Sequence, residues 1–318
     1  MTPSAKRSRT STRHTGVAAA VALTAATALL AGCSSSDTSD PLAGDKAAKG
    51  TVVVGSNNFA ESTLLADIYG EALRAKGIKV DYKHNIGSRE TTYAMMKNGA
   101  VTVLPEYNGS LLAHLDPKAA QDSAEAVNEA VLAKLDKELT LLTSSPAEDK
   151  DSVAVNAATA KKHGLTSESS LADLKDIAPG LVIGGSPEFQ TRRQGLKGLE
   201  SVYGLTFKSF KALDAGGPLT QSALTKNTVQ AADVFTTDPA IVKEGFVVLK
   251  DPENLFGFAQ VTPLVRKDGL PPEGAAALND VSAKLDTETL RELDARVQLE
   301  KKDPLDVAKE WLKSVGLD

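Results

Sequence analysis

The sequence predicts an α/β fold made of two α/β units, with the chain crossing between them twice and a ligand cleft where they meet. From Gly50 onward, short β-branched runs alternate with stretches of helical periodicity, and this favours parallel strands with crossover helices. A second round of the same alternation begins near Ser152. The chain has 318 residues, of which 42% are hydrophobic, enough for one large or two medium domains. Open sheets bind ligands at the carboxyl ends of their strands, so the cleft is the expected binding site.

The first round follows a strand, helix, strand, helix, strand order. Strands are expected at 51–55, 79–86 and 100–104, and helices at 61–76 and 88–97. The first of these helices carries an apolar face at helical spacing, made of Leu64, Leu65, Ile68, Tyr69, Ala72 and Leu73.

A long helix at 124–139 leads to the second round. Its strands are expected at 152–155, 181–184, 205–212 and 230–235, and its helices at 157–163, 190–203 and 219–225. Strand-like runs at 246–249 and 260–265 follow, and three amphipathic helices at 275–285, 290–297 and 305–315 complete the chain. Trp311, the single tryptophan, lies on the apolar face of the last helix and is expected in the core.

The N-terminus is typical of an export signal. Four positive residues, Lys6, Arg7, Arg9 and Arg13, precede an apolar stretch at 16–31. The stretch ends in Leu-Ala-Gly-Cys at 30–33, which resembles the bacterial lipobox, where the cysteine becomes the lipidated first residue. We therefore expect a signal peptide at 1–32 and an extracytoplasmic protein anchored to the cell membrane by lipidation at Cys33. An ordinary secretory signal with an incidental cysteine is the alternative.

Residues 33–49 are small and polar without a hydrophobic period, so they are expected to form a flexible tether. Removal of residues 1–32, with four positive and no negative charges, changes the formal net charge from −5 to −9. An acidic surface argues against nucleic acid as a partner. Since Cys33 is the only cysteine, the folded part has no internal disulfide.

Motifs of the common enzyme classes are missing from the sequence. His84, His114 and His163 do not have the spacing of metal ligands. The run Gly-Gly-Ser at 184–186 lacks the Gly-x-Ser-x-Gly nucleophile elbow, and no phosphate loop of the Gly-x-x-x-x-Gly-Lys type is present. We therefore expect a protein that is not an enzyme and that uses no metal or cofactor.

Four segments together resemble the substrate-binding proteins of the osmoprotectant (glycine betaine/choline/carnitine) ABC importers. They read VGSNNFAE at 54–61, PEYNGS at 105–110, PEFQTR at 187–192 and FTTD at 235–238. The resemblance covers roughly residues 50–318. It implies a two-lobed, type II-like periplasmic-binding-protein fold, a small betaine-like ligand, an ABC permease/ATPase complex as partner, and a monomer.

The resemblance also implies that the lobes close on the ligand about two hinge crossings. We expect lobe 1 at residues 50–150 plus 254–318, and lobe 2 at 151–253. A quaternary ammonium group has no N–H donor, so ring faces hold it, each contributing about 0.5–2 kcal/mol.

Individual roles follow by matching the family's motifs. Tyr107 matches an aromatic cage residue, and Phe235 stands where many relatives have a tyrosine of the cage. Ser110 matches a hydroxyl that contacts the ligand carboxylate. Arg192 matches the arginine that binds this carboxylate, and Glu188 precedes it by one helical turn and is expected to orient it.

Three further positions are expected near the ligand. Asn57 stands where some relatives carry a lysine and is expected to donate a hydrogen bond. Thr236 and Asp238 either line the ligand or cap the helix that begins near Pro239, and the sequence leaves both roles open.

Two cage positions of the relatives lack an aromatic residue in this chain. They fall at Asp151 or Ser152 and near Ala259, where Phe256 or Phe258 is a candidate substitute. Such an opened cage also suits an ergothioneine-like betaine or a weaker-bound osmolyte. An ordinary amino acid or another zwitterion is an alternative ligand. A lipoprotein enzyme on the same fold is the remaining alternative.

Overall fold

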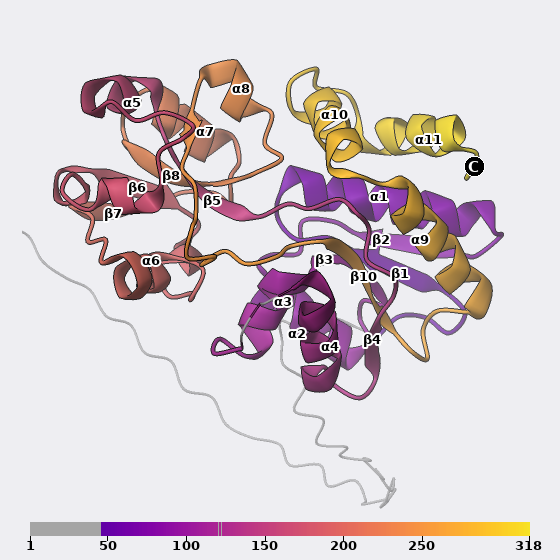
Figure 1. Ribbon diagram of the computed structural model, residues 1–318. Helices are drawn as coiled ribbons and strands as arrows, with labels where there is room; N and C mark the ends of the chain where they lie inside the picture. Colours follow the sequence, from indigo (N-terminus) through magenta and orange to yellow (C-terminus); the bar gives the residue numbers. More distant parts are fainter. Residues whose placement is uncertain (1–45, 120, 122) are drawn as a thin grey trace, which may run out of the picture. The chain divides into compact units, whose positions relative to one another are not determined.

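The computed structural model describes residues 46–119, 121 and 123–318 (Figure 1). The expected signal peptide and Cys33 lie outside the described residues. No helix in the described part of the chain is both long and apolar enough to span a membrane.

The strands form two separate five-stranded sheets. The first has the order β2 (Val80–Lys83), β1 (Val52–Gly55), β3 (Val103–Tyr107), β10 (Val261–Arg266) and β4 (Leu139–Leu141). β1 is parallel to β2 and β3, whereas β10 is antiparallel to both β3 and β4. A strand from near the C-terminus thus completes the sheet that the first round of the chain begins.

Helices cover both faces of the first sheet (Figure 1). On one face lie α1 (Ala60–Ala75), α9 (Pro272–Lys284), α10 (Thr287–Gln298) and α11 (Pro304–Val315). On the other face lie α2 (Arg89–Asn98), α3 (Asn108–Leu115) and α4 (Ala124–Lys134). Trp311 of α11 is buried in the core that this helix shares with α1, as the helical pattern predicts.

The second sheet has the order β7 (Ser209–Ala212), β6 (Val182–Gly185), β8 (Ala231–Phe235), β5 (Asp151–Val155) and β9 (Val247–Val248). Its helices are α5 (Ala157–His163), α6 (Leu196–Tyr203), α7 (Pro218–Thr225) and α8 (Ala240–Glu244), with short 3₁₀ turns at Leu171–Leu174, Ala178–Gly180 and Pro187–Gln190. Apolar clusters fill both faces of this sheet as well.

The chain passes from the first sheet to the second after β4 and returns before β10 (Figure 1). The two crossing segments run antiparallel and are hydrogen-bonded to each other. Asp149 N donates to Ala259 O at 3.0 Å, and Val261 N donates to Ala147 O at 3.0 Å. Paired crossings of this kind join two α/β units, so the expected fold class is confirmed.

Two predicted elements differ from the structure near the motifs. The strand expected at 100–104 is β3 at 103–107, which continues through Pro105. Pro105 lies opposite Pro263 of β10, so neither proline has an N–H to place in the ladder at this position. The helix expected at 190–203 begins only at Leu196, because Gly195 lies so close to the carbonyl of Phe189 that a Cβ there would be 2.0 Å from it. The helix α3 and the strand β4 were not predicted.

Candidate functional site

A cavity lies among the loops that follow strands of both sheets. It is lined by Asn57, Asn58, Phe59, Ser88, Arg89, Tyr107, Ser110, Asp149, Asp151, Ser186, Glu188, Arg192, Ala215, Asp233 and Phe235. β1, β3, β6, β7 and β8 all end at this cavity or shortly before it. It therefore occupies the position where open α/β sheets bind ligands. Its volume of about 50 Å³ has room for only a few water molecules.

Six of the residues expected at the ligand line this cavity together. They are Asn57, Tyr107, Ser110, Glu188, Arg192 and Phe235. They come from four separate segments of the chain and from both sheets, so the fold brings the four motifs to one place.

Aromatic rings from both sheets meet at the cavity. The ring centroid of Phe59 lies 4.9 Å from that of Phe235 and 6.0 Å from that of Tyr107. Phe59 immediately precedes α1, Tyr107 ends β3 and Phe235 ends β8. Phe59 lies within the VGSNNFAE motif, but the sequence analysis did not single it out. Faces of aromatic rings are the usual protein partner of a quaternary ammonium group.

The Tyr107 ring is held in place from behind by a buried carboxyl group. Tyr107 OH donates to Glu61 Oε1 at 2.5 Å, and Thr237 Oγ1 donates to Glu61 Oε2 at 2.6 Å. Glu61 is in α1, which packs against the first sheet, whereas Thr237 follows β8 of the second sheet. This one carboxyl group therefore orients a ring of the cavity and links residues associated with the two sheets.

Further carboxyl groups surround Glu61. Burial, followed by the charge of Asp294, raises the pKa of Glu61 well above its usual value. Burial likewise raises the pKa of Asp294 to about 7 and that of Asp149 well above its usual value. Asp149 accepts hydrogen bonds from Thr236 Oγ1 and Thr237 N, each at 3.2 Å. Burial behind the rings thus favours the protonated forms of these acids.

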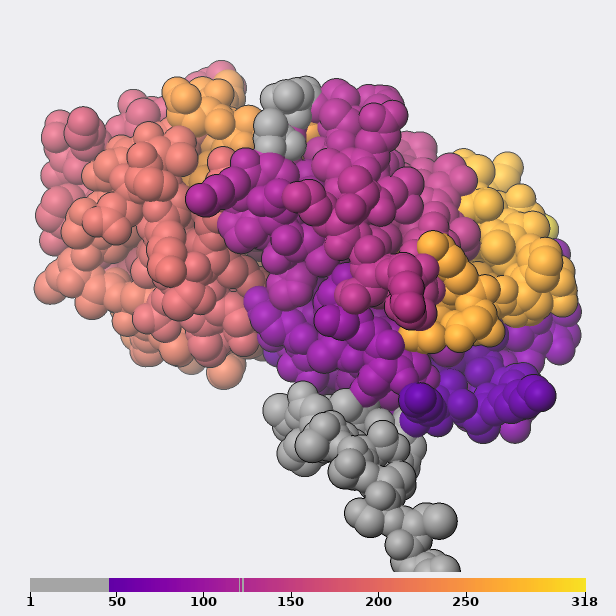
Figure 2. All heavy atoms as spheres, turned by 90° about the horizontal axis from the view of Figure 1, so that it is seen from below, coloured from indigo at the N-terminus to yellow at the C-terminus, as the bar shows by residue number. Residues whose placement is uncertain are grey.

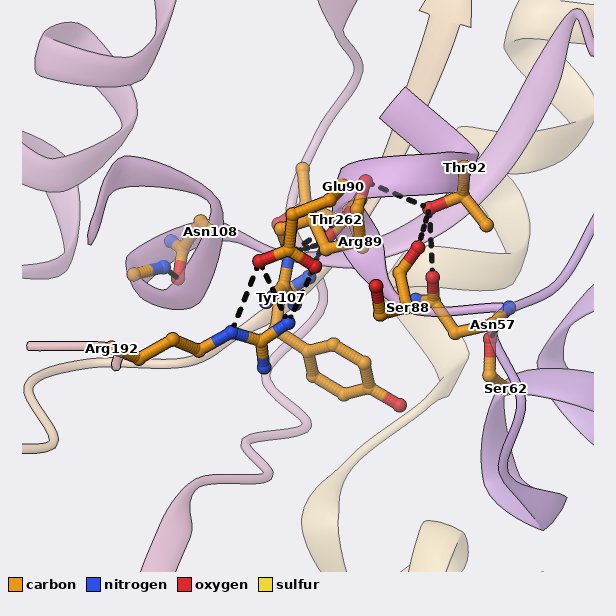
Figure 3. Close-up of polar contacts among 12 residues, drawn as sticks. Asn57, Ser62, Ser88, Arg89, Glu90, Thr92, Tyr107, Asn108, Arg192 and Thr262 are labelled. Atoms are coloured by element: carbon orange, nitrogen blue, oxygen red, sulfur yellow. Dashed lines mark hydrogen bonds and ion pairs between the residues drawn. The ribbon is translucent and has the colours of Figure 1, made fainter. Parts of the chain in front are cut away.

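Arg192 lies at the cavity but already has a carboxylate partner (Figure 3). Its Nε and Nη2 donate to Glu90 Oε1 at 3.3 and 3.1 Å, and its Nη2 donates to Glu90 Oε2 at 2.9 Å. Burial raises the pKa of Glu90, but the hydrogen bonds from Arg192 outweigh burial and lower this pKa to about 2. Glu90 is in α2, so the ion pair connects the two halves of the cavity wall.

The contact between these halves is also visible at the molecular surface. Figure 2 shows spheres of residues near 200, in salmon, beside those of residues near 100, in purple. A groove along this contact is lined by Arg89, Glu90, Ser110, His114, Arg192 and Lys197, among others.

The second arginine of the cavity is also paired. Arg89 Nε donates to both carboxylate oxygens of Glu106, at 2.9 and 3.1 Å, and Glu106 is fully buried. Asn57, expected as a donor to the ligand, accepts a hydrogen bond from Thr92 Oγ1 at 2.8 Å through its Oδ1. Both residues line the cavity with part of their hydrogen-bonding capacity already used.

Glu90, and not Glu188 as expected, is hydrogen-bonded to the Arg192 guanidinium. Arg192 N donates to the backbone carbonyl of Glu188 at 3.1 Å, but the guanidinium bonds go to Glu90. The prediction assumed a continuous helix through both residues, and the chain instead forms a 3₁₀ turn that ends at Gln190. Glu188 still lines the cavity and acts on Arg192 through its charge.

Thr236 and Asp238 lie away from this cavity. Asp238 Oδ1 accepts from Ala240 N, the first residue of α8, at 2.8 Å, although the cap position itself is Pro239. Thr236 Oγ1 accepts from Lys150 N at 3.0 Å and so fastens the end of β8 to the first crossing segment. Asp238 thus bonds the first N–H group of α8 from one position before the cap.

The two candidate substitute rings are placed elsewhere. Phe256 is buried in the core of the second sheet, and Phe258 packs against the core around α3 and α4. Ala259 is fully buried, and Ser152 Oγ donates to Val234 O at 2.9 Å within the sheet. Phe59 supplies the third ring instead.

A second and larger cavity, of about 380 Å³, lies beside the ring cluster. Phe59 and Phe235 line both cavities, so these rings form part of the partition between them. Asp238 lines this second cavity together with Glu61, Thr237 and Lys301. Separation of the two rings would join the cavities into a longer site.

Sequence reasoning missed the acidic part of the wall. Asp149, Asp151 and Asp233 line the first cavity, and two of them belong to strands β5 and β8 that the sequence places well. Alternation along a strand could have identified Asp233. It lies two positions before Phe235, so both side chains point to the same face of the sheet.

Residues 50–314 match the family described as OpuAC, the substrate binding domain of ABC-type glycine betaine transport system. The chain is 31% identical over 277 residues to the glycine betaine-binding protein YehZ of Escherichia coli (strain K12), a match that covers 83% of this chain and 90% of that protein. It is 25% identical over 273 residues to the ergothioneine transport permease/ergothioneine binding protein EgtU of Helicobacter pylori (strain G27), covering 84% of this chain and 48% of that protein.

Solved structures agree with this assignment. The structure of apo YehZ from Escherichia coli is similar with a TM-score of 0.59 and 29% identity, covering 84% of this chain and 99% of that one. The crystal structure of a glycine betaine/carnitine/choline ABC transporter protein shares the fold with a TM-score of 0.66 and 22% identity, at the same coverage of 84% and 99%. The chain therefore belongs to the OpuAC family of ABC-type glycine betaine transport systems and is a substrate-binding protein, not an enzyme.

Proposed function

We propose that this protein captures a quaternary-ammonium solute of the betaine type outside the cytoplasm and delivers it to an ABC permease. The observation that carries the proposal is the convergence of Phe59, Tyr107 and Phe235 on one cavity. A quaternary ammonium has no donor for a conventional hydrogen bond, and the negative faces of aromatic rings are its usual protein partner. The glycine betaine-binding relatives support the same class of ligand.

Capture is proposed to proceed by closure of two lobes, residues 50–150 with 254–318 and residues 151–253. The cavity walls come from both lobes, and the crossing segments between them are suited to act as hinges. Because the cavity is bounded by walls from both ranges of residues, separation of the lobes would open it for entry of the ligand. A ligand that contacts both walls then shifts the population toward the closed state.

Arg192 is proposed to exchange its partner when the ligand carries a carboxylate. A ligand carboxylate competes with Glu90 for the same guanidinium fork. Ser110, in the first turn of α3, lines the cavity as well and offers a hydroxyl to the same group.

The protein is proposed to be a monomer held at the membrane through a lipid on Cys33. The Leu-Ala-Gly-Cys sequence at 30–33, after a positive and then apolar stretch, supports this anchor. Mass spectrometry of the purified membrane form tests it, since a lipidated Cys33 gives a diacylglyceryl mass on the N-terminal peptide, and an unmodified thiol there contradicts it.

A larger betaine, of the ergothioneine type, is the second candidate ligand. The cavity of about 380 Å³ behind the Phe59–Phe235 partition favours it, because it offers room for a ring beyond the ammonium group. The similarity to the ergothioneine-binding relative points in the same direction.

Thermal melting of residues 34–318 with a panel of solutes tests the proposed function. Glycine betaine, choline, carnitine, ergothioneine and common amino acids would each be added in excess. A solute that binds only the folded state adds about 2.7 kcal/mol at a hundredfold excess over its Kd. We expect a rise in Tm with at least one methylated ammonium compound, which Phe59→Ala and Phe235→Ala both reduce. Rises with the unmethylated amino acids alone would contradict the cage.

A further inference from the structure

The wall of the cavity also contains two carboxyl groups next to a ring. Asp151 of β5 pairs with Phe235 of β8, and Val153 pairs with Asp233, in an antiparallel register. Residues directly opposite each other point to the same face of a sheet, so Asp151, Asp233 and Phe235 lie on one face. All three line the cavity.

Asp233 has no hydrogen-bond partner for one of its oxygens. The residue is 4% exposed, and its Oδ1 is buried without a donor from any residue that the structure describes. Next to it on β6 is Gly185, where a Cβ would be only 3.1 Å from the Asp233 Cβ. Because position 185 is a glycine, the Asp233 side chain has space beside β6.

An unpaired buried carboxyl group is costly, because it loses its hydration without a replacement. Burial, followed by the charge of Asp151, raises the pKa of Asp233 well above its usual value. The charge of Arg192 offsets this increase only in part, and its guanidinium donates its hydrogen bonds to Glu90. A buried group in this state at a binding cavity is most simply explained by a partner that arrives with the ligand.

The ligand's charge makes Asp233 an acceptor. A quaternary ammonium held by Phe235 lies beside Asp151 and Asp233, and its positive charge favours their ionised forms. An ionised carboxylate accepts hydrogen bonds and cannot donate them. Glycine betaine carries no N–H or O–H group and would leave Asp233 unpaired.

We propose that the cavity selects quaternary-ammonium solutes that also carry a hydroxyl or N–H donor, and that Asp233 accepts the hydrogen bond from this donor. The inference rests on the proposed function, since it concerns the same cavity, and it names the second feature by which the ligand is chosen. A site built to accept a donor discriminates strongly against the analogue that lacks it.

Two ligand pairs that differ by a single hydroxyl test the inference. Choline is compared with ethyltrimethylammonium, and carnitine with γ-butyrobetaine, by calorimetric titration of the intact folded chain. For the wild type we expect the hydroxyl member of each pair to bind about tenfold to a hundredfold more tightly, the effect of one hydrogen bond to a charged acceptor. For Asp233→Ala we expect this preference to fall below about twofold.

Three further measurements separate the role of Asp233 from general damage. Asp233→Asn keeps an oxygen acceptor without the charge, and an intermediate preference is expected. Both Asp233 variants are expected to melt at or above the wild-type temperature, because each removes an unpaired buried carboxyl group. Asp67→Asn removes another buried carboxyl group, whose Oδ1 lies 3.0 Å from His84 Nε2 and which does not line the cavity, and it should keep the full preference.

Equal affinities within both pairs in the wild type would overturn this inference and leave the proposed function intact. An unchanged preference in Asp233→Ala would also overturn it, since another residue would then accept the donor. Failure of all four ligands to bind, and of glycine betaine and ergothioneine as well, would instead contradict the proposed function, and the inference with it.

Discussion

Two carboxylates compete for the Arg192 guanidinium: that of Glu90 in the same chain and that of a ligand. In the structure its guanidinium makes three hydrogen bonds to Glu90, and both side chains are partly exposed. An exposed ion pair of this kind contributes at most about 1 kcal/mol. Glu90 therefore lowers the affinity for a carboxylate-bearing ligand only moderately.

Replacement of Glu90 by glutamine is predicted to favour carboxylate-bearing ligands. Loss of the competing charge frees Arg192, so the Kd of carnitine should fall by up to about fivefold, whereas that of choline should stay within about twofold. Titration calorimetry at low salt measures both values. Glu310→Gln, which breaks the exposed pair with Arg296 in α10 and α11, is the matched control and should change neither. Tighter binding of choline and carnitine alike would show that Glu90 acts on closure, not on Arg192.

The sequence predicts the residues of the site better than their partners. Tyr107, Arg192 and Phe235 lie in recognisable motifs, and all three line the cavity. Glu61 and Glu90, which hold Tyr107 and Arg192, are separated from them by 46 and 102 residues. Pairs this distant depend on how the elements pack, and one sequence without relatives carries no signal for them.

At the scale of elements, Gly109 joins the ring-bearing strand to the return crossing. A Cβ on Gly109 would lie 1.6 Å from the backbone oxygen of Phe258, so a side chain there has no space. The neighbouring Asn108 Oδ1 accepts from Gln260 N at 2.9 Å, which fixes the same contact. The Asn-Gly pair of the PEYNGS motif thus packs α3 against the crossing segment before β10.

Gly109→Ala is predicted to disturb both stability and binding. The crossing segment must move away, so we expect a loss of about 2–3 kcal/mol, as for overpacked cores, together with weaker ligand binding because Tyr107 adjoins the same turn. Urea denaturation and titration of choline measure the two effects. Gly204→Ala is the comparison for overpacking, since a Cβ at Gly204 meets nothing within 4 Å and only its φ of 66° opposes the substitution. An equal loss in both variants would contradict the close-approach explanation.

Elements with clear periodicity could be predicted from the sequence, and those set by backbone packing could not. The apolar face of 61–76 and the amphipathic helix with Trp311 correspond to α1 and α11 with small shifts at their ends. The segment 190–203 has a helical apolar pattern too, yet Gly195 and Gly198 lie against the carbonyls of Phe189 and Arg193. Such contacts are visible only in three dimensions.

At the scale of the whole molecule, the buried acids set an unusual pH dependence of stability. The pKa of Asp294 and that of Asp67 are raised to about 7, with burial as the main cause in both. An acid whose pKa is higher in the folded state stabilises the fold fully below its unfolded value near 4, and this contribution is lost as the pH rises through 7. Burial lowers the pKa of two half-buried histidines, His84 and His114, and they act in the opposite direction as the pH rises toward their unfolded value near 6.5.

The ligand-free protein is therefore predicted to melt at a higher temperature at pH 5 than at pH 8. A difference of several degrees is expected, since 1 kcal/mol corresponds to roughly 2–4 °C for chains of 150–250 residues. Asp294→Asn should reduce this difference, because the amide does not ionise. Calorimetric melting across the range measures it, and a Tm that rises steadily from pH 5 to pH 8 would show that these acids are ionised in the fold.

The central claim is that the rings of Phe59, Tyr107 and Phe235 bind a positive charge and not merely a shape. The most direct measurement compares choline with its neutral carbon isostere, 3,3-dimethyl-1-butanol, by titration calorimetry. Both have the same size and the same hydroxyl, so only the charge differs. The account predicts that choline binds more than about tenfold more tightly, since each ring contributes about 0.5–2 kcal/mol to holding the cation. Equal affinities would contradict it, because the cavity would then recognise an apolar group of that shape.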